Sequence, residues 1–207
     1  MYFAFWTVAK LIKRLVKLIR KVLKMVKVLA VTGYKSHELG IFDDKHIGIK
    51  YIKKVLEKRI ISFVEEGLEW VLISGQLGVE LWCGEVVINL KQQFPQLKLA
   101  VLTPFFNQEE RWNDQKKDHY RFVLQQADYV DTITKRDYES PSQLKLKNQF
   151  IVEKSDALLV VFDEDKPGSP SYYITYAKAR NEHSNYEIYY IYPDEIELAY
   201  RDELENW

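Results

Sequence analysis

Small and hydroxyl-bearing residues follow three of the segments predicted to be buried strands. Thr32–Gly33 ends the first segment, Ser74–Gly75 ends the second with Gly78 opening the next helix, and Gly168–Ser169 precedes a later helix. Glycine has no Cβ to block an approaching anion, and a helix N-terminus presents free amides and a positive dipole end. Each turn alone is typical of a glycine turn with a capping hydroxyl. Together at one sheet edge they predict a nucleotide-sized site that holds phosphate.

Four side chains beside these turns suit the rest of a nucleotide. Glu80 lies in the first helical turn, where the dipole stabilises a carboxylate, and it suits either a ribose hydroxyl contact or a plain surface position. Tyr34 follows a strand in a loop, where we expect no packing role, so it is a candidate to stack on a base; Trp82 either stacks or packs in the core. Gln76 offers both a donor and an acceptor. The candidate ligand-binding residues are Thr32, Gly33, Tyr34, Ser74, Gly75, Gln76, Gly78, Glu80, Trp82, Thr103, Gly168 and Ser169.

The sequence lacks the common motifs for other chemistries. It has neither the Gly-Lys-Ser/Thr of a Walker loop nor the Gly-x-Gly-x-x-Gly dinucleotide turn after the first strand. Its four histidines have no ligand-like spacing, and its single cysteine excludes a disulfide framework. We therefore expect no metal site and a cytoplasmic location, and these residues indicate no certain cofactor.

Strand and helix patterns alternate along the body of the chain. Short apolar runs at 28–31, 70–73, 97–102, 129–133, 157–162 and 188–192 predict strands, and the segments 47–66, 78–94, 108–127, 143–154 and 171–183 predict helices. This alternation favours an α/β fold with one doubly wound, mainly parallel sheet covered by helices on both faces. In such Rossmann-like sheets, ligands bind beyond the carboxyl ends of the strands, where the strand order reverses.

The charge divides the chain into two parts. The chain has 207 residues, with 30 Lys plus Arg and 30 Asp plus Glu, but residues 1–24 hold seven of the bases and no acid. The remainder has 23 basic against 30 acidic residues, a formal charge of −7. General nucleic-acid binding is unlikely for so acidic a body, because neutralising phosphates needs clustered Lys and Arg. The mixed charges of segment 108–127 indicate a solvated face instead.

Residues 1–24 form a basic amphipathic extension with apolar positions at helical spacing. One interpretation is a helix that lies on an anionic membrane surface. The other is translated upstream sequence, with the true start at Met25, because Met25 opens a typical first strand. We favour the second, and expect one Rossmann-like domain over residues 25–207.

Several long stretches resemble one family in order and over nearly all of the body. These are TGYKSHELGIF (32–42), EEGLEWVLISGQLGVELW (65–82), LTPF (102–105), QADY (126–129), YESP (138–141), KNQFIVEKSDALL (147–159) and GSP (168–170). They resemble the YpsA family of bacterial proteins, which looks like a branch of the Rossmann-like SLOG superfamily, named after DprA/Smf and the LOG phosphoribohydrolases.

The resemblance implies a nucleotide-derived ligand, with NAD- or ADP-ribose-like molecules as candidates. In LOG enzymes a glutamate on the helix after a Gly-rich turn takes part in N-glycosidic cleavage, and Glu80 is the matching residue and the one candidate catalytic residue. Their full Pro-Gly-Gly-x-Gly-Thr pattern is absent here.

Three functions stay open on this basis. The favoured one is a nucleotide-binding module that senses ligand and reports to a regulatory protein partner. The second is a LOG-type hydrolase of nucleoside phosphates, and the third is an adaptor with a vestigial pocket, held at a membrane surface if residues 1–24 are genuine. Homo-oligomerisation through helices is compatible with all three.

Overall fold

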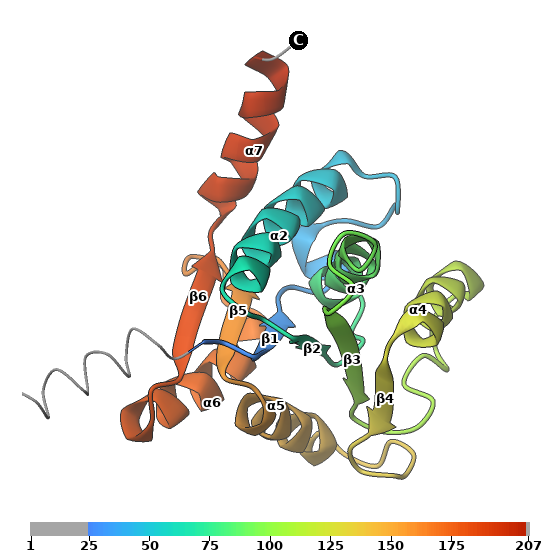
Figure 1. Ribbon diagram of the computed structural model, residues 1–207. Coiled ribbons are helices and arrows are strands. Elements are labelled where there is room, and N and C mark those ends of the chain that lie inside the picture. Colours follow the sequence, from blue (N-terminus) through green and yellow to red (C-terminus); the bar gives the residue numbers. More distant parts are fainter. Residues whose placement is uncertain (1–24, 206–207) are drawn as a thin grey trace, which may run out of the picture.

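A six-stranded sheet forms the centre of the computed structural model, which describes residues 25–205 (Figure 1). The extension predicted for residues 1–24 lies outside them. All strand pairs are parallel, and the strand order is β4-β3-β2-β1-β5-β6. The strands are β1 (Val28–Thr32), β2 (Trp70–Ile73), β3 (Lys98–Thr103), β4 (Tyr129–Thr132), β5 (Ala157–Val161) and β6 (Glu187–Ile191). The predicted doubly wound, parallel α/β fold is confirmed.

Burial explains which strands lie at the centre. Every residue of β5 is buried, and β1 is buried from Leu29 to Thr32, because both strands have helices on both sides. In the register of the sheet, Leu29 lies opposite Val71 on β2 and Ala157 on β5. At the edge, β4 is exposed or half-buried throughout. The apolar runs of the sequence therefore mark the central strands most clearly.

The helices cover the two faces unequally (Figure 1). On one face α7 packs on α2, α2 on α3, and α3 on α4, while α5 and α6 pack together on the other. Their bounds are η1 (Ser36–Leu39, a 3₁₀ turn), α2 (Ile47–Glu65), α3 (Val79–Leu90), α4 (Asp114–Gln126), α5 (Ser142–Lys154), α6 (Pro170–His183) and α7 (Pro193–Glu205). None of the described helices is long and apolar enough to cross a membrane.

Two helical elements, η1 and α7, were not predicted from the sequence. The start of α7 carries an ordinary signal, with Pro193 in its first turn followed by two acidic residues. The predicted helix at 108–127 starts later, at Asp114, because Asn113 caps it by accepting a hydrogen bond from the Lys116 amide. The preceding segment forms turns, with Asn107 at a φ of 55°.

The C-terminal helix α7 is attached mainly by ion pairs and by half-buried side chains. It has no buried residue, and Ile196 and Ala199 are half-buried against the core. Ion pairs join it to α2: Glu203 contacts Lys50 and Lys54, and Glu195 contacts Arg59. The Tyr200 ring also meets the Tyr51 ring edge-on, with centroids 5.1 Å apart.

The strand order reverses between β1 and β5. The chain proceeds outward from β1 through β2 and β3 to β4, and then crosses back to β5 on the other side of β1. The helices that follow β1 and β5, α2 and α6, therefore lie on opposite faces of the sheet, and ligands of such folds bind at this point of the carboxyl edge. The turn after β2 and the start of α5 lie beside it, as the residues lining the cavity described next demonstrate.

Candidate functional site

The carboxylate of Glu80 lies at the centre of this edge. Its side chain is 3% exposed and turns back from the first turn of α3 toward the ends of β1 and β2. Oε1 accepts a hydrogen bond from the Thr32 hydroxyl at 2.8 Å. Oε2 accepts from the Ser74 amide at 2.7 Å, the Ser74 hydroxyl at 2.6 Å and the Gln76 amide at 3.3 Å. The donors of the β2–α3 turn, which the sequence suggested for a ligand anion, thus form hydrogen bonds with the Glu80 carboxylate instead.

A buried lysine approaches the same turn from the opposite face of the sheet. Lys147 of α5 is 5% exposed, donates a hydrogen bond to the Ser74 hydroxyl at 3.3 Å, and lies 4.5 Å from the centre of the Tyr173 ring. Burial lowers the pKa of Lys147 to about 8; the Glu80 carboxylate opposes this shift and the Lys35 ammonium adds to it. Burial, and then the charge of Glu80, raises the pKa of Tyr173 well above its usual value.

A cavity of about 220 Å³ opens in front of these side chains. It is enclosed by the end of β1, the β2–α3 turn, and the first turns of α5 and α6, so it spans the reversal in strand order. Its lining comprises Thr32, Gly33, Lys35, Gln76, Glu80, Pro141, Leu144, Lys145, Lys147, Asn148, Ser169, Tyr172 and Tyr173.

Asn148 lines the cavity and carries a buried hydrogen-bond acceptor that no described residue uses. The residue is 6% exposed, and its Oδ1 atom has no hydrogen-bond partner within residues 25–205. A buried amide oxygen without a partner is uncommon, because leaving it unpaired costs about 1–3 kcal/mol. Since the atom belongs to a residue that lines the cavity, a bound molecule with a donor group is a natural partner.

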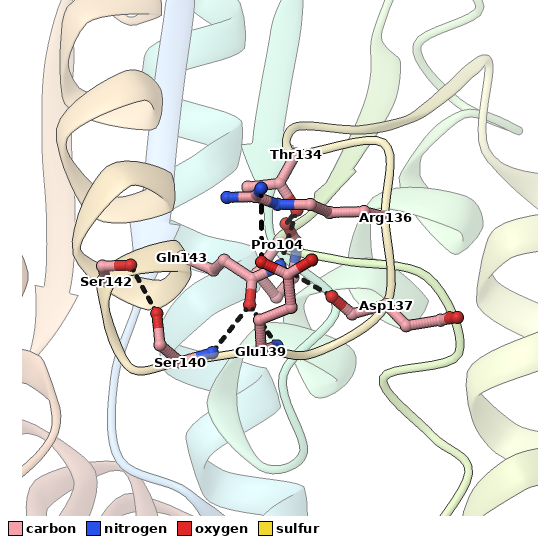
Figure 2. Close-up of polar contacts among 8 residues, drawn as sticks. All are labelled: Pro104, Thr134, Arg136, Asp137, Glu139, Ser140, Ser142 and Gln143. Atoms are coloured by element: carbon pink, nitrogen blue, oxygen red, sulfur yellow. Dashed lines mark hydrogen bonds and ion pairs between the residues drawn. The ribbon is translucent and has the colours of Figure 1, made fainter.

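The loop between β4 and α5 fixes the position of the helix that carries Lys147 and Asn148. Figure 2 shows the Gln143 side chain at the centre of this loop. Its oxygen accepts from two loop amides and its nitrogen donates to a hydroxyl and a carbonyl, the partners being Glu139, Ser140, Thr134 and Asp137. The Thr134 hydroxyl in turn donates to the Pro104 carbonyl after β3, at 2.8 Å. The start of α5 is thereby tied to the sheet.

The glycines of the β2–α3 turn allow other parts of the chain to pack closely against this turn. Gly78 has a φ of 96°, and a Cβ there would lie 2.5 Å from the Tyr34 carbonyl oxygen and the Ser36 nitrogen. A Cβ at Gly75 would meet Tyr120 and Gln108. Of the predicted glycines only Gly33 lines the cavity, and its missing side chain makes room for Val79.

The two predicted aromatic candidates are both packed inside the protein. Tyr34 is 6% exposed, its hydroxyl donates to the Asp163 and Lys166 carbonyls and accepts from the Asp163 amide, and its ring stacks near Phe162. The expectation that Tyr34 lacks a packing role is therefore wrong. Trp82 is 5% exposed and belongs to the core, the second of the two alternatives given by the sequence.

A second internal carboxylate occupies the start of α6. The Ser169 amide and hydroxyl both donate to Glu38 of η1, which also accepts from the Lys35 amide at 2.7 Å. Burial raises the pKa of Glu38, but these hydrogen bonds outweigh it and leave the pKa below its usual value. The Ser169 groups that the sequence suggested for a ligand anion thus donate to a carboxylate of the protein itself.

The structure brings together six of the twelve predicted residues around the cavity: Thr32, Gly33, Gln76, Glu80 and Ser169 in its wall, with Ser74 directly behind Glu80. Thr103 lies apart and its hydroxyl contacts Thr132 at 2.8 Å, while Gly168 faces a different hollow beside α7. Sequence reasoning missed Lys147, Lys35, Lys145 and Tyr172 as lining residues. The stretch 147–159 was matched to the family, but nothing in it indicated that a lysine would be buried.

Comparison with known proteins decides the family. A family model described as the YspA SLOG family matches residues 29–196. The chain belongs to the YpsA family of SLOG proteins. The resemblance found in the sequence is therefore confirmed.

Relatives of this YpsA-family protein match over nearly their full length. A UPF0398 protein of Bacillus cereus (strain ATCC 14579) is 56% identical over 181 residues, which cover 87% of this chain and 98% of the relative. A UPF0398 protein of Halalkalibacterium halodurans is 56% identical over 182 residues, covering 87% and 96%.

A solved structure gives a weaker match. It is that of DNA processing protein A from Helicobacter pylori, described for its single-stranded DNA binding mode. It is 14% identical with a TM-score of 0.47, over 77% of this chain and 65% of that one, and a likeness at this level carries no argument about function.

Proposed function

We propose that this YpsA-family protein binds a nucleotide or nucleotide derivative in the 220 Å³ cavity and acts as a cytoplasmic sensing or regulatory module. One observation carries the proposal: the buried ammonium of Lys147 and the oxygen of Asn148, which has no partner within residues 25–205, belong to neighbouring residues in the wall of the same cavity. Both groups lack what a phosphorylated sugar supplies, an anion for the one and a hydroxyl donor for the other.

The electrostatics support an anionic ligand. The charge of Lys35 is close enough to lower the pKa of Lys147. A third lysine, Lys145, lines the same cavity. The nearby carboxylate of Glu80 already accepts four hydrogen bonds from the protein, so its charge is spread over those donors. An anion among the three lysines would stabilise the charged form of Lys147, which burial disfavours.

The same hydrogen bonds favour binding over hydrolysis. An acid for N-glycosidic cleavage must hold a proton within reach of the leaving group. Both oxygens of Glu80 already accept hydrogen bonds from the protein. Oε1 accepts from the Thr32 hydroxyl, and Oε2 accepts from two backbone amides, which can only donate. We therefore assign Glu80 a positioning role, in which it joins the ends of β1 and β2 through Thr32 and Ser74.

Thermal unfolding of the full chain with AMP, ADP-ribose and NAD at pH 7 tests the proposal. At least one of these should raise the melting temperature, because a molecule that binds only the folded state stabilises it. Lys147→Met should abolish the shift, whereas Lys154→Met, an exposed lysine on the same helix, should keep it. If no nucleotide shifts the wild-type protein, the proposal fails.

Incubation with the same nucleotides tests the hydrolase alternative. We expect no free base after incubation with the wild-type protein. Base release by the wild type that Glu80→Gln abolishes would replace the positioning role with a catalytic one.

A further inference from the structure

The cavity also points to the part of the ligand that it recognises. We infer that it holds the ribose phosphate of a nucleotide and leaves the base outside, so that binding is nearly indifferent to base identity. This inference rests on the proposed function and specifies the ligand class of the same site.

The size of the cavity is the first argument. Sites that enclose a whole drug-sized ligand measure roughly 300–1,000 Å³. The cavity here measures about 220 Å³, so it encloses only part of a nucleotide. The enclosed part must be the part that its lining can satisfy.

The lining satisfies a sugar phosphate. Lys35, Lys145 and Lys147 provide cations for the phosphate. The Asn148 oxygen accepts hydrogen bonds and cannot pair with a phosphate oxygen, so it needs a donor on the same ligand. A ribose hydroxyl next to the phosphate is such a donor, and inorganic phosphate carries no sugar hydroxyl.

The position of the aromatic rings places the base outside. The inner ring, Tyr173, is 4% exposed and faces the Lys147 ammonium, which leaves it unavailable for stacking. The other ring in the lining, Tyr172, is 65% exposed at the rim. Stacking on one exposed ring is available to every base, since each has a π-face, and it distinguishes bases only weakly.

Calorimetric titration of the full chain at pH 7 tests this, with AMP, GMP, CMP, UMP, ribose 5-phosphate, adenosine and inorganic phosphate. The four monophosphates should bind within about tenfold of each other, the spread that stacking strength on an exposed ring allows. Ribose 5-phosphate should also bind, adenosine should not, and inorganic phosphate should bind at least about tenfold more weakly than ribose 5-phosphate, the equivalent of one hydrogen bond.

Two variants separate the contacts. Asn148→Leu should weaken ribose 5-phosphate by about tenfold, the equivalent of one hydrogen bond, and leave inorganic phosphate unchanged. Tyr172→Ala should weaken all four monophosphates by about tenfold or more, the loss of one stacking contact, and leave ribose 5-phosphate unchanged. Thermal unfolding without ligand verifies that both variants fold.

The outcomes distinguish a failure of the proposed function from a failure of the ribose-phosphate inference alone. If none of the phosphorylated compounds binds and ADP-ribose and NAD also fail, the proposed function is wrong. If one monophosphate binds more than about tenfold tighter than the others, beyond what stacking on an exposed ring allows, or adenosine matches AMP, the nucleotide site stands and the inference is overturned. Binding of ADP-ribose or NAD without ribose 5-phosphate or any monophosphate also overturns it.

Discussion

Replacing Lys147 with methionine should make the protein more stable at pH 6.5 and less stable at pH 9.5. The native pKa of Lys147 is about 8, against 10.5 for an unperturbed lysine. Between these values the unfolded chain binds more protons, so the free energy of unfolding rises with pH over this window. Below pH 8 burying the charged ammonium lowers the free energy of unfolding by its full amount, about 3 kcal/mol at 1.36 kcal/mol per pKa unit.

Methionine fills a similar volume without the buried charge. It gives up the hydrogen bond to Ser74 and the contact with the Tyr173 ring, together about 2 kcal/mol. At pH 6.5 the variant should therefore gain about 1 kcal/mol. At pH 9.5 the penalty in the wild type has fallen by about 2 kcal/mol, so the variant should lose about 1 kcal/mol instead.

Urea unfolding followed by tryptophan fluorescence at both pH values measures this difference. Lys154→Met is the matched control, since Lys154 is an exposed lysine on the same helix. A stability difference between wild type and Lys147→Met that stays constant from pH 6.5 to 9.5 would refute the reasoning. It would mean that Lys147 titrates as a solvated lysine and that the cavity is wetter than its burial indicates.

Three further substitutions test the framework around the site, each by urea unfolding. Gly78→Ala should lower the free energy of unfolding by about 3 kcal/mol, because the new Cβ meets the backbone at 2.5 Å in a left-handed conformation; a loss below 1 kcal/mol would contradict the close approach. Tyr34→Phe should lower it by about 2 kcal/mol, since the part-buried Asp163 amide loses its acceptor, whereas an unchanged midpoint would mean that water replaces the hydroxyl. Gln143→Leu should lower it by about 2 kcal/mol and speed amide exchange in the 134–142 loop; unaltered exchange there would show that the loop is held by other contacts.

The sequence allowed the sheet and the location of the site to be predicted because both depend on local pattern. Apolar runs locate the strands, and parallel strands place all their carboxyl ends at one edge. That logic was enough to bring Thr32, Ser74 and Glu80 into one candidate site. The chemistry of their contacts was not predictable, because it depends on which oxygens and amides meet across 48 residues of chain.

The missed residues have a common physical cause. Lys147 is buried because α5 packs on the sheet face opposite α3, against β1 and β3, and its second turn meets the β2–α3 turn, a packing with no local signature. Glu38 meets Ser169 across 131 positions. Tyr34 appeared to be a free loop aromatic because its partners, the backbone groups of Asp163 and Lys166, come from the far end of the chain.

The attachment of α7 sets where this fold opens first. Ion pairs between partly exposed side chains contribute little and weaken further with salt, so the contacts of Glu195 and Glu203 with α2 hold the helix loosely. In native-state hydrogen exchange, the amides of α7 should lose protection at a free energy well below that of β1 and β5, and raising the salt concentration should widen the gap. The half-buried Ile196 and Ala199 would then reach solvent while the sheet and the cavity at its carboxyl edge stay intact.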